Sequence, residues 1–345
     1  MTKAASQPSA GELEERGILS PVHTPEPAPR ETETPARARR HRVSCLINHY
    51  NYGAYVEEAV ASVLAQTHAV DEVVLVDDGS DPDHLEAARR AAASSPLVRL
   101  IEKENGGQLS CFQIGVAESS GDVVFFLDAD DVWEPGYVER CLRIYEDRAG
   151  IDFIFTHNKK LFTDGRLEGE EQPSADHGYS VAWCLERGGV WVGAVTSCLS
   201  MRRKILDRIF PVVDDTIYRV CADEVLVYGA SIAGARKYFL GEPLVRYRVH
   251  GKNAWFGKAD SPERAYLRRL HGRMIVEALR KRIGLPPSLM AIAHYEYRTV
   301  SKELPTRRAL YKEYCSLVWK SDLRILRKVR VVSGLMSWHY FSKMI

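Results

Sequence analysis

From Val43 onward, short apolar runs alternate with helix-forming stretches, and this alternation restricts the fold more than any other feature. The runs VSCLIN, EVVLVDD, LVRLI and VVFFLD, at 43–48, 72–78, 97–101 and 123–128, have the length and composition of buried strands. The segments between them, at 56–64, 82–93 and 107–118, carry helix periodicity or strong helix formers. The pattern predicts an α/β fold, with a mostly parallel sheet that is flanked by helices on both faces.

The sequence divides into three predicted parts. Residues 1–40 are rich in Pro, Glu, Thr and Arg and have almost no large apolar side chains, which predicts a disordered tail. Residues 41–253 carry the strand and helix alternation. From 254 to 345 helix signals dominate: one helix is expected to start at Ser261-Pro-Glu and to end at Gly284, with a further helical stretch over about 287–330.

Charge and cysteine content restrict the partners and the compartment. Lys and Arg number 47 against 46 Asp and Glu, so the net charge of +1 gives no global reason to bind nucleic acid. Seven scattered cysteines without a CxxC pair favour a reducing compartment. We find neither a secretory signal pattern nor a run of about 18 apolar residues, and we therefore expect a cytoplasmic protein.

Carboxylates follow the fourth predicted strand in GDVVFFLDADDVWEPG, residues 121–136, at Asp128, Asp130 and Asp131. Ligands of parallel sheets bind beyond the carboxyl ends of the strands, so these groups lie where a site is expected. Clustered carboxylates raise one another's pKa unless a cation or backbone N–H groups compensate. The cluster predicts Mg²⁺ or Mn²⁺ bridging to a diphosphate. The alternative is an Asp-rich turn before the helix that is expected near Gly136.

A second acidic pair, Asp77 and Asp78, closes the second predicted strand in VLVDDGSD. Gly79 permits a tight turn there, and the carboxylates can accept hydrogen bonds from a nucleobase or from ribose hydroxyls. The alternative is that they cap the helix that follows.

Five ordered motifs across residues 43–253 resemble those of family 2 glycosyltransferases, which have the GT-A fold. They are INHYNYGAYVEEAVASVLAQTHAVDEVVLVDDGSDP, ENGGQLSCFQIGVAESSGDVVFFLDADDVWEPG, TSCLSMRR, CADEVL and EPLVRYRVHGKN. The resemblance implies a Rossmann-like sheet that binds a nucleoside-diphosphate sugar and transfers the sugar, with inversion, to a hydroxyl acceptor.

The resemblance also implies roles for particular residues. The base and ribose of the donor are expected near Asn48, Tyr50, Asp77 and Asp78, with Gly107 and Gln108 also near the nucleotide; Asp128 and Asp130 form the family's DxD motif. Asp223 is the expected general base, with Glu224 beside it. Arg248 and His250 are expected to reach the diphosphate or the metal. The predicted metal ligands are therefore Asp130 and His250.

For three of the residues in the second half of the chain, purely structural roles are alternatives. Asp223 could be a helix cap, and His250 could be a packed or capping histidine. Trp191 could be a platform for a sugar or part of the core.

The sequence departs from the family pattern at several positions. Asn48 stands where many relatives have Pro, and Phe112 and Gln113 stand where many have Arg and Asn. Ala222 replaces the acidic residue that often precedes the base. These departures put nucleotide contacts from the helix at 107–118 in doubt, and they leave the expected metal ligands in place.

The last 23 residues, LRILRKVRVVSGLMSWHYFSKMI, combine basic with apolar and aromatic side chains. This composition is typical of a helix in a membrane interface, here the inner face of the membrane. It also suits a helix that is docked on the catalytic domain or on a second subunit of a homo-oligomer.

The predicted function is glycosyl transfer to a carbohydrate, lipid-linked or small-molecule acceptor, in polysaccharide or natural-product synthesis. One alternative is a catalytically silent nucleotide-sugar-binding protein on the same fold. The other is a nucleotidyltransferase, although the basic glycine-rich loop expected after its first strand has no counterpart in NHYNYGAY.

Overall fold

A computed structural model describes residues 41–212, 218–251, 253, 256 and 261–341. The predicted disordered tail, residues 1–40, lies outside the described residues. His41–Ile345 form one compact unit.

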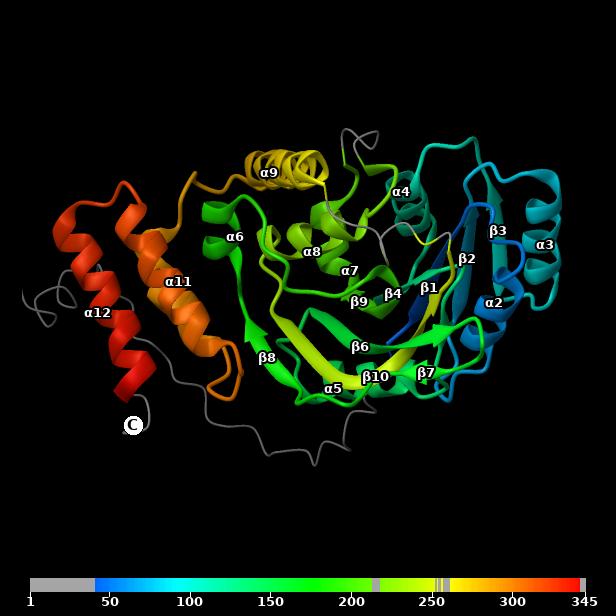
Figure 1. Cartoon of the computed structure of the whole chain (residues 1–345), viewed down its shortest axis with the longest axis horizontal. Helices are drawn as coiled ribbons and strands as arrows, with labels where there is room; N and C mark the ends of the chain where they lie inside the picture. The colour runs from blue at the N-terminus through cyan, green and yellow to red at the C-terminus, as the bar shows by residue number, and fades with distance from the viewer. Residues whose placement is uncertain (1–40, 213–217, 252, 254–255, 257–260, 342–345) are drawn as a thin grey trace, which may run out of the picture. The chain divides into compact units, whose positions relative to one another are not determined.

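The four predicted strands form one half of the central sheet (Figure 1). They are β1 (Val43–His49), β2 (Glu72–Asp77), β3 (Val98–Glu102) and β4 (Val123–Asp128). All of them pair in parallel, in the order β3-β2-β1-β4. The prediction of an α/β fold with a mostly parallel sheet is confirmed.

The sheet continues from β4 through β9 (Leu199–Arg202), β6 (Phe153–Phe162), β10 (Lys237–Val249) and β5 (Val132–Trp133). In this half β6 and β10 are parallel, whereas β9 runs antiparallel to both of its neighbours and β5 runs antiparallel to β10. Two short strands pair at the side, β7 (Leu167–Glu168) with β6 and β8 (Ala175–Gly178) with β10.

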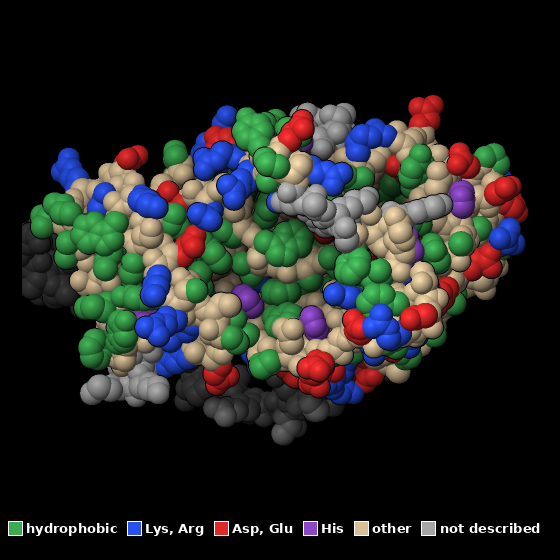
Figure 2. Space-filling view, viewed as in Figure 1, with side chains coloured by type: hydrophobic (Ala, Val, Ile, Leu, Met, Phe, Trp, Pro, Cys, Tyr) green, Lys and Arg blue, Asp and Glu red, His purple; other side chains and the backbone are tan. Residues whose placement is uncertain are grey.

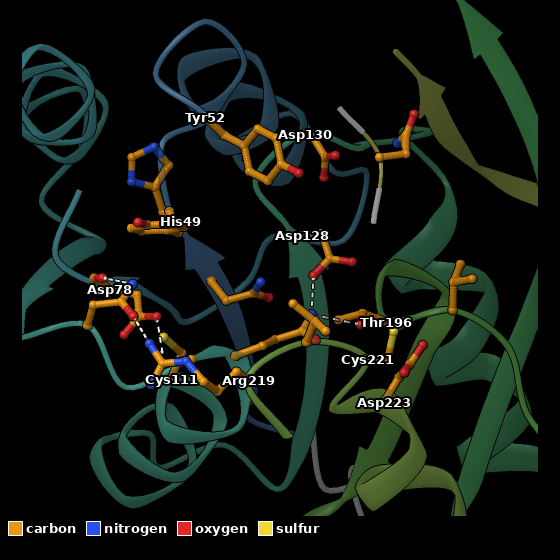
Figure 3. Close-up of a pocket in the computed structure, with 18 of the residues that line it drawn as sticks. His49, Tyr52, Asp78, Cys111, Asp128, Asp130, Thr196, Arg219, Cys221 and Asp223 are labelled. Atoms are coloured by element: carbon orange, nitrogen blue, oxygen red, sulfur yellow. Dashed lines mark hydrogen bonds between the residues drawn. The ribbon is translucent and has the colours of Figure 1, made fainter. Parts of the chain in front are cut away.

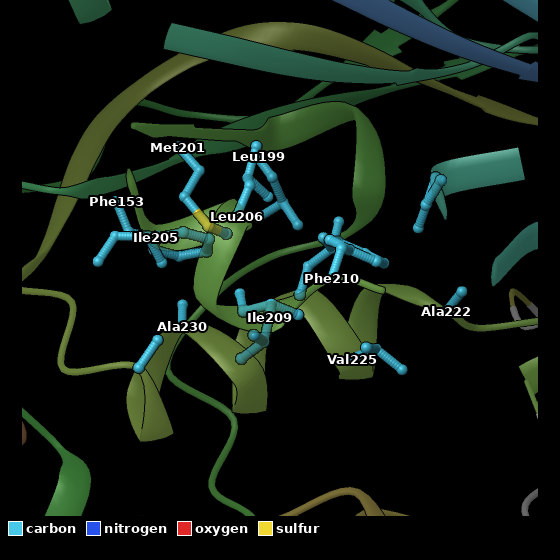
Figure 4. Packing of buried hydrophobic residues seen from close by; sticks show 14 of the residues in the cluster. Phe153, Leu199, Met201, Ile205, Leu206, Ile209, Phe210, Ala222, Val225 and Ala230 are labelled. Carbon is cyan, nitrogen blue, oxygen red and sulfur yellow. The ribbon is translucent and has the colours of Figure 1, made fainter. Parts of the chain in front are cut away.

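Helices cover both faces because the strands are apolar on both sides. On β2, for example, Val73 and Leu75 belong to one buried cluster and Val74 and Val76 to another. The first cluster is completed by helices α2 (Val56–Leu64), α3 (Pro82–Ala93) and α5 (Tyr137–Asp147). The second is completed by α4 (Gln108–Glu118), α6 (Val181–Arg187), α7 (Arg203–Ile209) and α8 (Asp223–Ile232), and part of it is drawn in Figure 4.

The C-terminal helices begin with α9 (Pro262–Ile283), which packs against α8. As predicted, the Ser261 side chain caps its start by accepting the Arg264 N–H, and Gly284 ends it in a left-handed conformation. The short turns η1 (Thr196–Cys198) and η3 (Met290–Ile292) precede β9 and α10, respectively.

A third cluster joins α10 (Ala293–Arg298), α11 (Arg307–Lys320) and α12 (Ile325–Phe341). Val331 and Leu335 fix α12 in this cluster. Its other face leaves Ile325, Leu326 and Tyr340 exposed. The last helix is thus docked on its own chain, and it still presents apolar side chains outward.

Two observations concern the expected compartment. All seven cysteines are free. None of the helices that the structure describes combines the length and hydropathy of a membrane span.

Candidate active site

A cavity of about 380 Å³ opens at the carboxyl ends of the central strands. Its size lies within the range of roughly 300–1,000 Å³ that small-molecule sites occupy. Asp128 and Asp223 line one side of it, and Asp78 and Arg219 line the other (Figure 3). The lining includes eight of the predicted site residues: Asn48, Tyr50, Asp78, Gly107, Gln108, Asp128, Asp130 and Asp223.

Asp78 shapes the nucleotide end that the sequence predicts. Its carboxylate accepts hydrogen bonds from the backbone N–H groups of Gly106 and Gly107, both at 2.8 Å, and pairs with Lys103. Because backbone donors and Lys103 already hold it, the side chain fixes the turn that leads into α4.

Gly107 is required by geometry at this turn. Its φ is +91°, and a Cβ atom there would overlap the Cα of Arg219. Gly107→Ala is therefore expected to displace Arg219 from the cavity wall and to weaken nucleotide binding. The matched control is Gly165→Ala, at φ +84° with open space around it, which carries only the backbone cost of about 1–2 kcal/mol. Thermal melting and nucleotide titration of both variants measure the difference, and equal losses would contradict a steric role for Gly107.

Asp77 is not among the cavity-lining residues, although the sequence places it beside Asp78. Its carboxylate accepts from the ring of His49 at 2.7 Å and from the N–H groups of Gly79 and Ser80. Burial by itself raises the pKa of Asp77, but the hydrogen bonds from His49 and Ser80 outweigh it and lower that pKa. Asp77 thus holds the turn after β2; it does not cap α3 (Pro82–Ala93), whose N-cap residue is Asp81 without a side-chain cap.

Gln108, the first residue of α4, is hydrogen-bonded to the end of β4 and to the residue that precedes α8. Its amide nitrogen donates to Asp128 at 2.8 Å, and its amide oxygen accepts from the Ala222 N–H at 2.9 Å. Asn48, beside Asp128 in the sheet register, also donates to that carboxylate. The Oδ1 atom of Asn48 is buried and has no hydrogen-bond partner among the described residues.

The three aspartates after β4 have different partners. Asp131 has a structural role, because its carboxylate oxygens accept hydrogen bonds from the Ser197 hydroxyl at 2.6 Å and from the Arg248 backbone N–H at 2.8 Å. Asp130 contacts the ring of His250 at 2.9 Å. Asp128 and Asp130 both line the cavity, and Asp131 does not.

Arg248 and His250 are not among the cavity-lining residues, and their contact with the diphosphate or the metal stays a prediction. The Arg248 guanidinium donates to the backbone oxygen of Asp130 and to Glu58, and stacks over Tyr55. The His250 ring also stacks on Tyr55, with centroids 5.3 Å apart. Both side chains therefore position the segment that carries Asp130.

The acidic cluster fits a hard divalent cation. Oxygen atoms of Asp128, Asp130 and Asp131 come within 4.8 Å of one another. Because Asp128 and Asp130 line the cavity and Asp131 does not, Asp128 and Asp130 are the two carboxylates that could hold an ion there. Carboxylate oxygens at one edge of a cavity are typical ligands for Mg²⁺ or Mn²⁺.

The carboxylates of the site repel one another. Burial, and then the charge of Asp130, raise the pKa of Asp128. Burial and the charges of Asp130 and Asp128 raise the pKa of Asp131. Burial, followed by the charges of Asp128 and Glu224, raises the pKa of Asp223 to about 8. The site is thus short of positive charge.

This charge deficit predicts how stability depends on pH. The folded protein keeps protons on these carboxyls that the unfolded chain, with pKa values near 4, has released. The metal-free protein is therefore expected to lose stability as pH rises from about 4 to about 8. Thermal melting over this range with a chelator, and again with Mn²⁺, measures the effect. Mn²⁺ should stabilise most at the upper end, and equal stabilisation at every pH would contradict a carboxylate site.

Asp223 is the first residue of α8 and is 8 % exposed. Its neighbour Glu224 accepts from the Tyr218 hydroxyl at 3.2 Å, and burial raises the pKa of Glu224 to about 7. Only Asp223 of the two lines the cavity. Trp191 is 47 % exposed and lies edge-on to Tyr228, so it is not a core residue.

Several cavity-lining residues were not among the predicted site residues, including Tyr52, Thr196, Arg219 and Tyr247. Arg219 is the most consequential: its side chain donates to Asn105, and its backbone oxygen accepts the Gln108 N–H at 3.0 Å. More than a hundred residues separate it from Gln108, so no local pattern marks it.

Comparisons with known proteins agree with this geometry. The family model described as glycosyl transferase family 2 matches residues 44–210. An uncharacterized glycosyltransferase of Nostoc sp. is 31 % identical over 312 residues, which cover 87 % of this chain and 90 % of that protein. A chondroitin synthase of Pasteurella multocida is 34 % identical over 125 residues, 36 % of this chain and 13 % of that one.

Solved structures show the same fold. The crystal structure of S. aureus TarS 1-349 in complex with UDP-GlcNAc superposes with a TM-score of 0.50 at 14 % identity, and covers 88 % of this chain and 91 % of that one. The Nostoc relative matches over most of both chains, and the family model matches residues 44–210, which include the cavity residues of β1, β4 and α4 but not those of α8 and β10. On these grounds the chain belongs to glycosyl transferase family 2.

Proposed function

We propose that this protein transfers a sugar from a nucleoside-diphosphate sugar to an acceptor hydroxyl, with inversion at the anomeric carbon and with a divalent cation. The observation that supports this most is that Asp128, Asp130 and Asp223 line one cavity with Asp78 at its other end. One side of the cavity thus offers candidate groups for a metal-bound diphosphate and a base, while the other offers polar groups for a nucleoside.

The nucleoside is proposed to bind between β1, β2 and the turn before α4. Tyr50 is exposed there and offers a ring face. Arg219 borders the same end, and its cationic side chain suits an anionic ligand.

Asp128 and Asp130 are the proposed carboxylate ligands of Mg²⁺ or Mn²⁺, and His250, whose ring lies 2.9 Å from the Asp130 carboxylate, is the proposed imidazole ligand. When bound, the cation supplies positive charge that offsets the charge developing on the leaving diphosphate and lowers the pKa of nearby carboxyls. The protein then supplies the fixed orientation of Asp128, through Gln108 and Asn48.

Asp223 is the proposed general base. An attacking hydroxyl must lose its proton as it bonds to the anomeric carbon, and a carboxylate across the cavity from the nucleoside end can accept it. Attack on the side opposite the diphosphate is a direct displacement, which inverts the anomeric centre.

The donor is tested first as a uridine nucleotide, because the TarS structure contains UDP-GlcNAc. The acceptor class is proposed to be a growing polysaccharide or a lipid-linked sugar, in line with the chondroitin synthase relative. The cytoplasmic location stays a prediction.

Release of nucleoside diphosphate from a panel of UDP-, GDP- and dTDP-sugars, with and without Mn²⁺, tests this proposal. We expect metal-dependent release that increases when carbohydrate acceptors are added. A protein that is stabilised by these donors yet releases nothing with any acceptor would be a silent binder, and that outcome would overturn the proposal.

A further inference from the structure

Helix α9 is apolar on two opposite faces. One face buries Ile275, Val276 and Leu279 in the cluster that it shares with α8. The other face exposes Tyr266, with 64 % of its surface free, and Met274, with 46 % free. A helix that has already buried one apolar face has no need of a second for folding.

The exposed apolar side chains form a continuous stripe. Tyr266, Leu270 and Met274 recur every four residues, so they lie one above the other along the helix, with Leu267 beside them. The stripe extends over about 12 Å at 1.5 Å per residue. In Figure 2 it is the apolar patch over α9, bordered by basic side chains.

Basic residues border the stripe on both sides. Arg264 lies on one side at helical spacing, and Arg269 and Arg273 lie on the other; all three are exposed. Residues 262–283 contain seven Arg or Lys against two acidic residues, and Glu277, one of the two, pairs with Arg280. At the same helical spacing, Glu263 and Glu277 lie at the two ends of the stripe, and Glu277 also pairs with Lys281. The surface is therefore apolar in the middle, positive along its two sides, and has one carboxylate at each end.

Helix α9 lies beside the helix that begins at Asp223, with the stripe on its outer face. The opposite face of α9 packs on α8. The His271 ring, one turn from Met274, contacts Tyr218, whose hydroxyl donates to Glu224. Whatever covers the stripe is held close to the proposed general base.

We propose that the α9 stripe, defined as Tyr266, Leu267, Leu270 and Met274 with Arg264, Arg269 and Arg273, docks on an anionic lipid bilayer. Apolar side chains flanked by arginines suit the boundary between acyl chains and acidic headgroups. Docking there places the cavity at the headgroup level, where the hydroxyl of a lipid-borne acceptor arrives. The statement about the acceptor rests on the proposed function, whereas the docking of the stripe on a bilayer does not.

A second copy of the chain is a poorer occupant of this surface. With seven basic and two acidic residues in α9, a two-fold pairing of the helix with itself brings together two surfaces of the same net positive charge. Acidic headgroups offer the complementary charge that a second copy lacks.

Sedimentation of the full chain with vesicles tests the proposal. Vesicles of phosphatidylcholine alone are compared with vesicles of equal parts phosphatidylcholine and phosphatidylglycerol, at low and at physiological salt. We expect binding to the acidic vesicles that weakens with salt. Each arginine near such a surface contributes about fivefold, so Arg264→Gln/Arg269→Gln/Arg273→Gln is expected to lose about 100-fold in partitioning.

A second variant and two controls locate the contact. Leu270→Ser/Met274→Ser should lose vesicle binding while keeping its melting temperature, since both side chains are exposed. The α12 control, Ile325→Ser/Leu326→Ser, tests the other surface that exposes apolar side chains among basic ones. A neutral control, Leu97→Ser/Leu167→Ser, changes exposed apolar side chains outside both helices. Both should bind like the unchanged protein.

Three results overturn the proposal: no binding to acidic vesicles, unchanged binding by both α9 variants, or loss of binding in the α12 control alone. A change of oligomeric state in the α9 variants, measured by light scattering, would assign the stripe to a second copy instead. Nucleotide binding, titrated separately in each variant, tests the cavity independently of the vesicles.

Discussion

Asp223→Asn is expected to bind the donor as tightly as the unchanged protein and to transfer its sugar about 10²- to 10⁴-fold more slowly. The amide has nearly the shape of the carboxylate but cannot accept a proton from the attacking hydroxyl. Because burial and neighbouring charges raise the pKa of Asp223 to about 8, its replacement also removes a repulsive group. The melting temperature should therefore stay the same or rise.

The matched control is Glu224→Gln, next to Asp223 and bonded to Tyr218 rather than lining the cavity. Single-turnover rates with a fixed donor, together with calorimetric titration of that donor, separate the chemical step from binding. We expect the Glu224 variant to retain most of the rate. Normal turnover by Asp223→Asn would move the base to another residue.

Asp130→Ala is expected to abolish nearly all metal-dependent donor binding. Asp130 and Asp128 are the two carboxylates of the cluster that line the cavity, and a single remaining carboxylate is a weak ligand for Mg²⁺ or Mn²⁺. Calorimetric titration of the donor in the presence of Mn²⁺ measures the loss.

An exposed aspartate in the turn between β6 and β7 provides the control. Asp164→Ala changes the net charge by the same amount as Asp130→Ala and lies outside the cavity. It should leave the titration unchanged. Donor binding by Asp130→Ala that equals that of the control would remove Asp130 from the metal site.

The first half of the fold could be predicted from sequence because its strands are buried on both faces. Uninterrupted apolar runs such as VVFFLD leave few other structures open. Strands β5 to β10 lacked this signal: β5 has two residues, and β6 and β10 extend into partly exposed ends with charged side chains.

Cavity residues could be predicted from sequence where a side chain with suitable chemistry also lies at the end of a predicted strand. Asp128 lies at the carboxyl end of a buried strand, and register alone brings it beside Asn48. The sequence places Arg248 and His250 near the predicted metal site, but the contacts of their side chains come only from the structure. Both stack on Tyr55 and hold the Asp130 segment from behind. Arg219 was missed because only tertiary packing over Gly107 places it in the cavity.

Thermal melting of the unchanged protein with UDP, GDP and dTDP, each with Mn²⁺ and with a chelator, tests the central claim most directly. The claim is that the carboxylates after β4 and a divalent cation together hold the diphosphate of the donor. We predict that one nucleoside diphosphate raises the melting temperature strongly with Mn²⁺ and little without it, since ligand and metal stabilise each other's binding. Equal stabilisation with and without Mn²⁺, or none by any of the three, would contradict it.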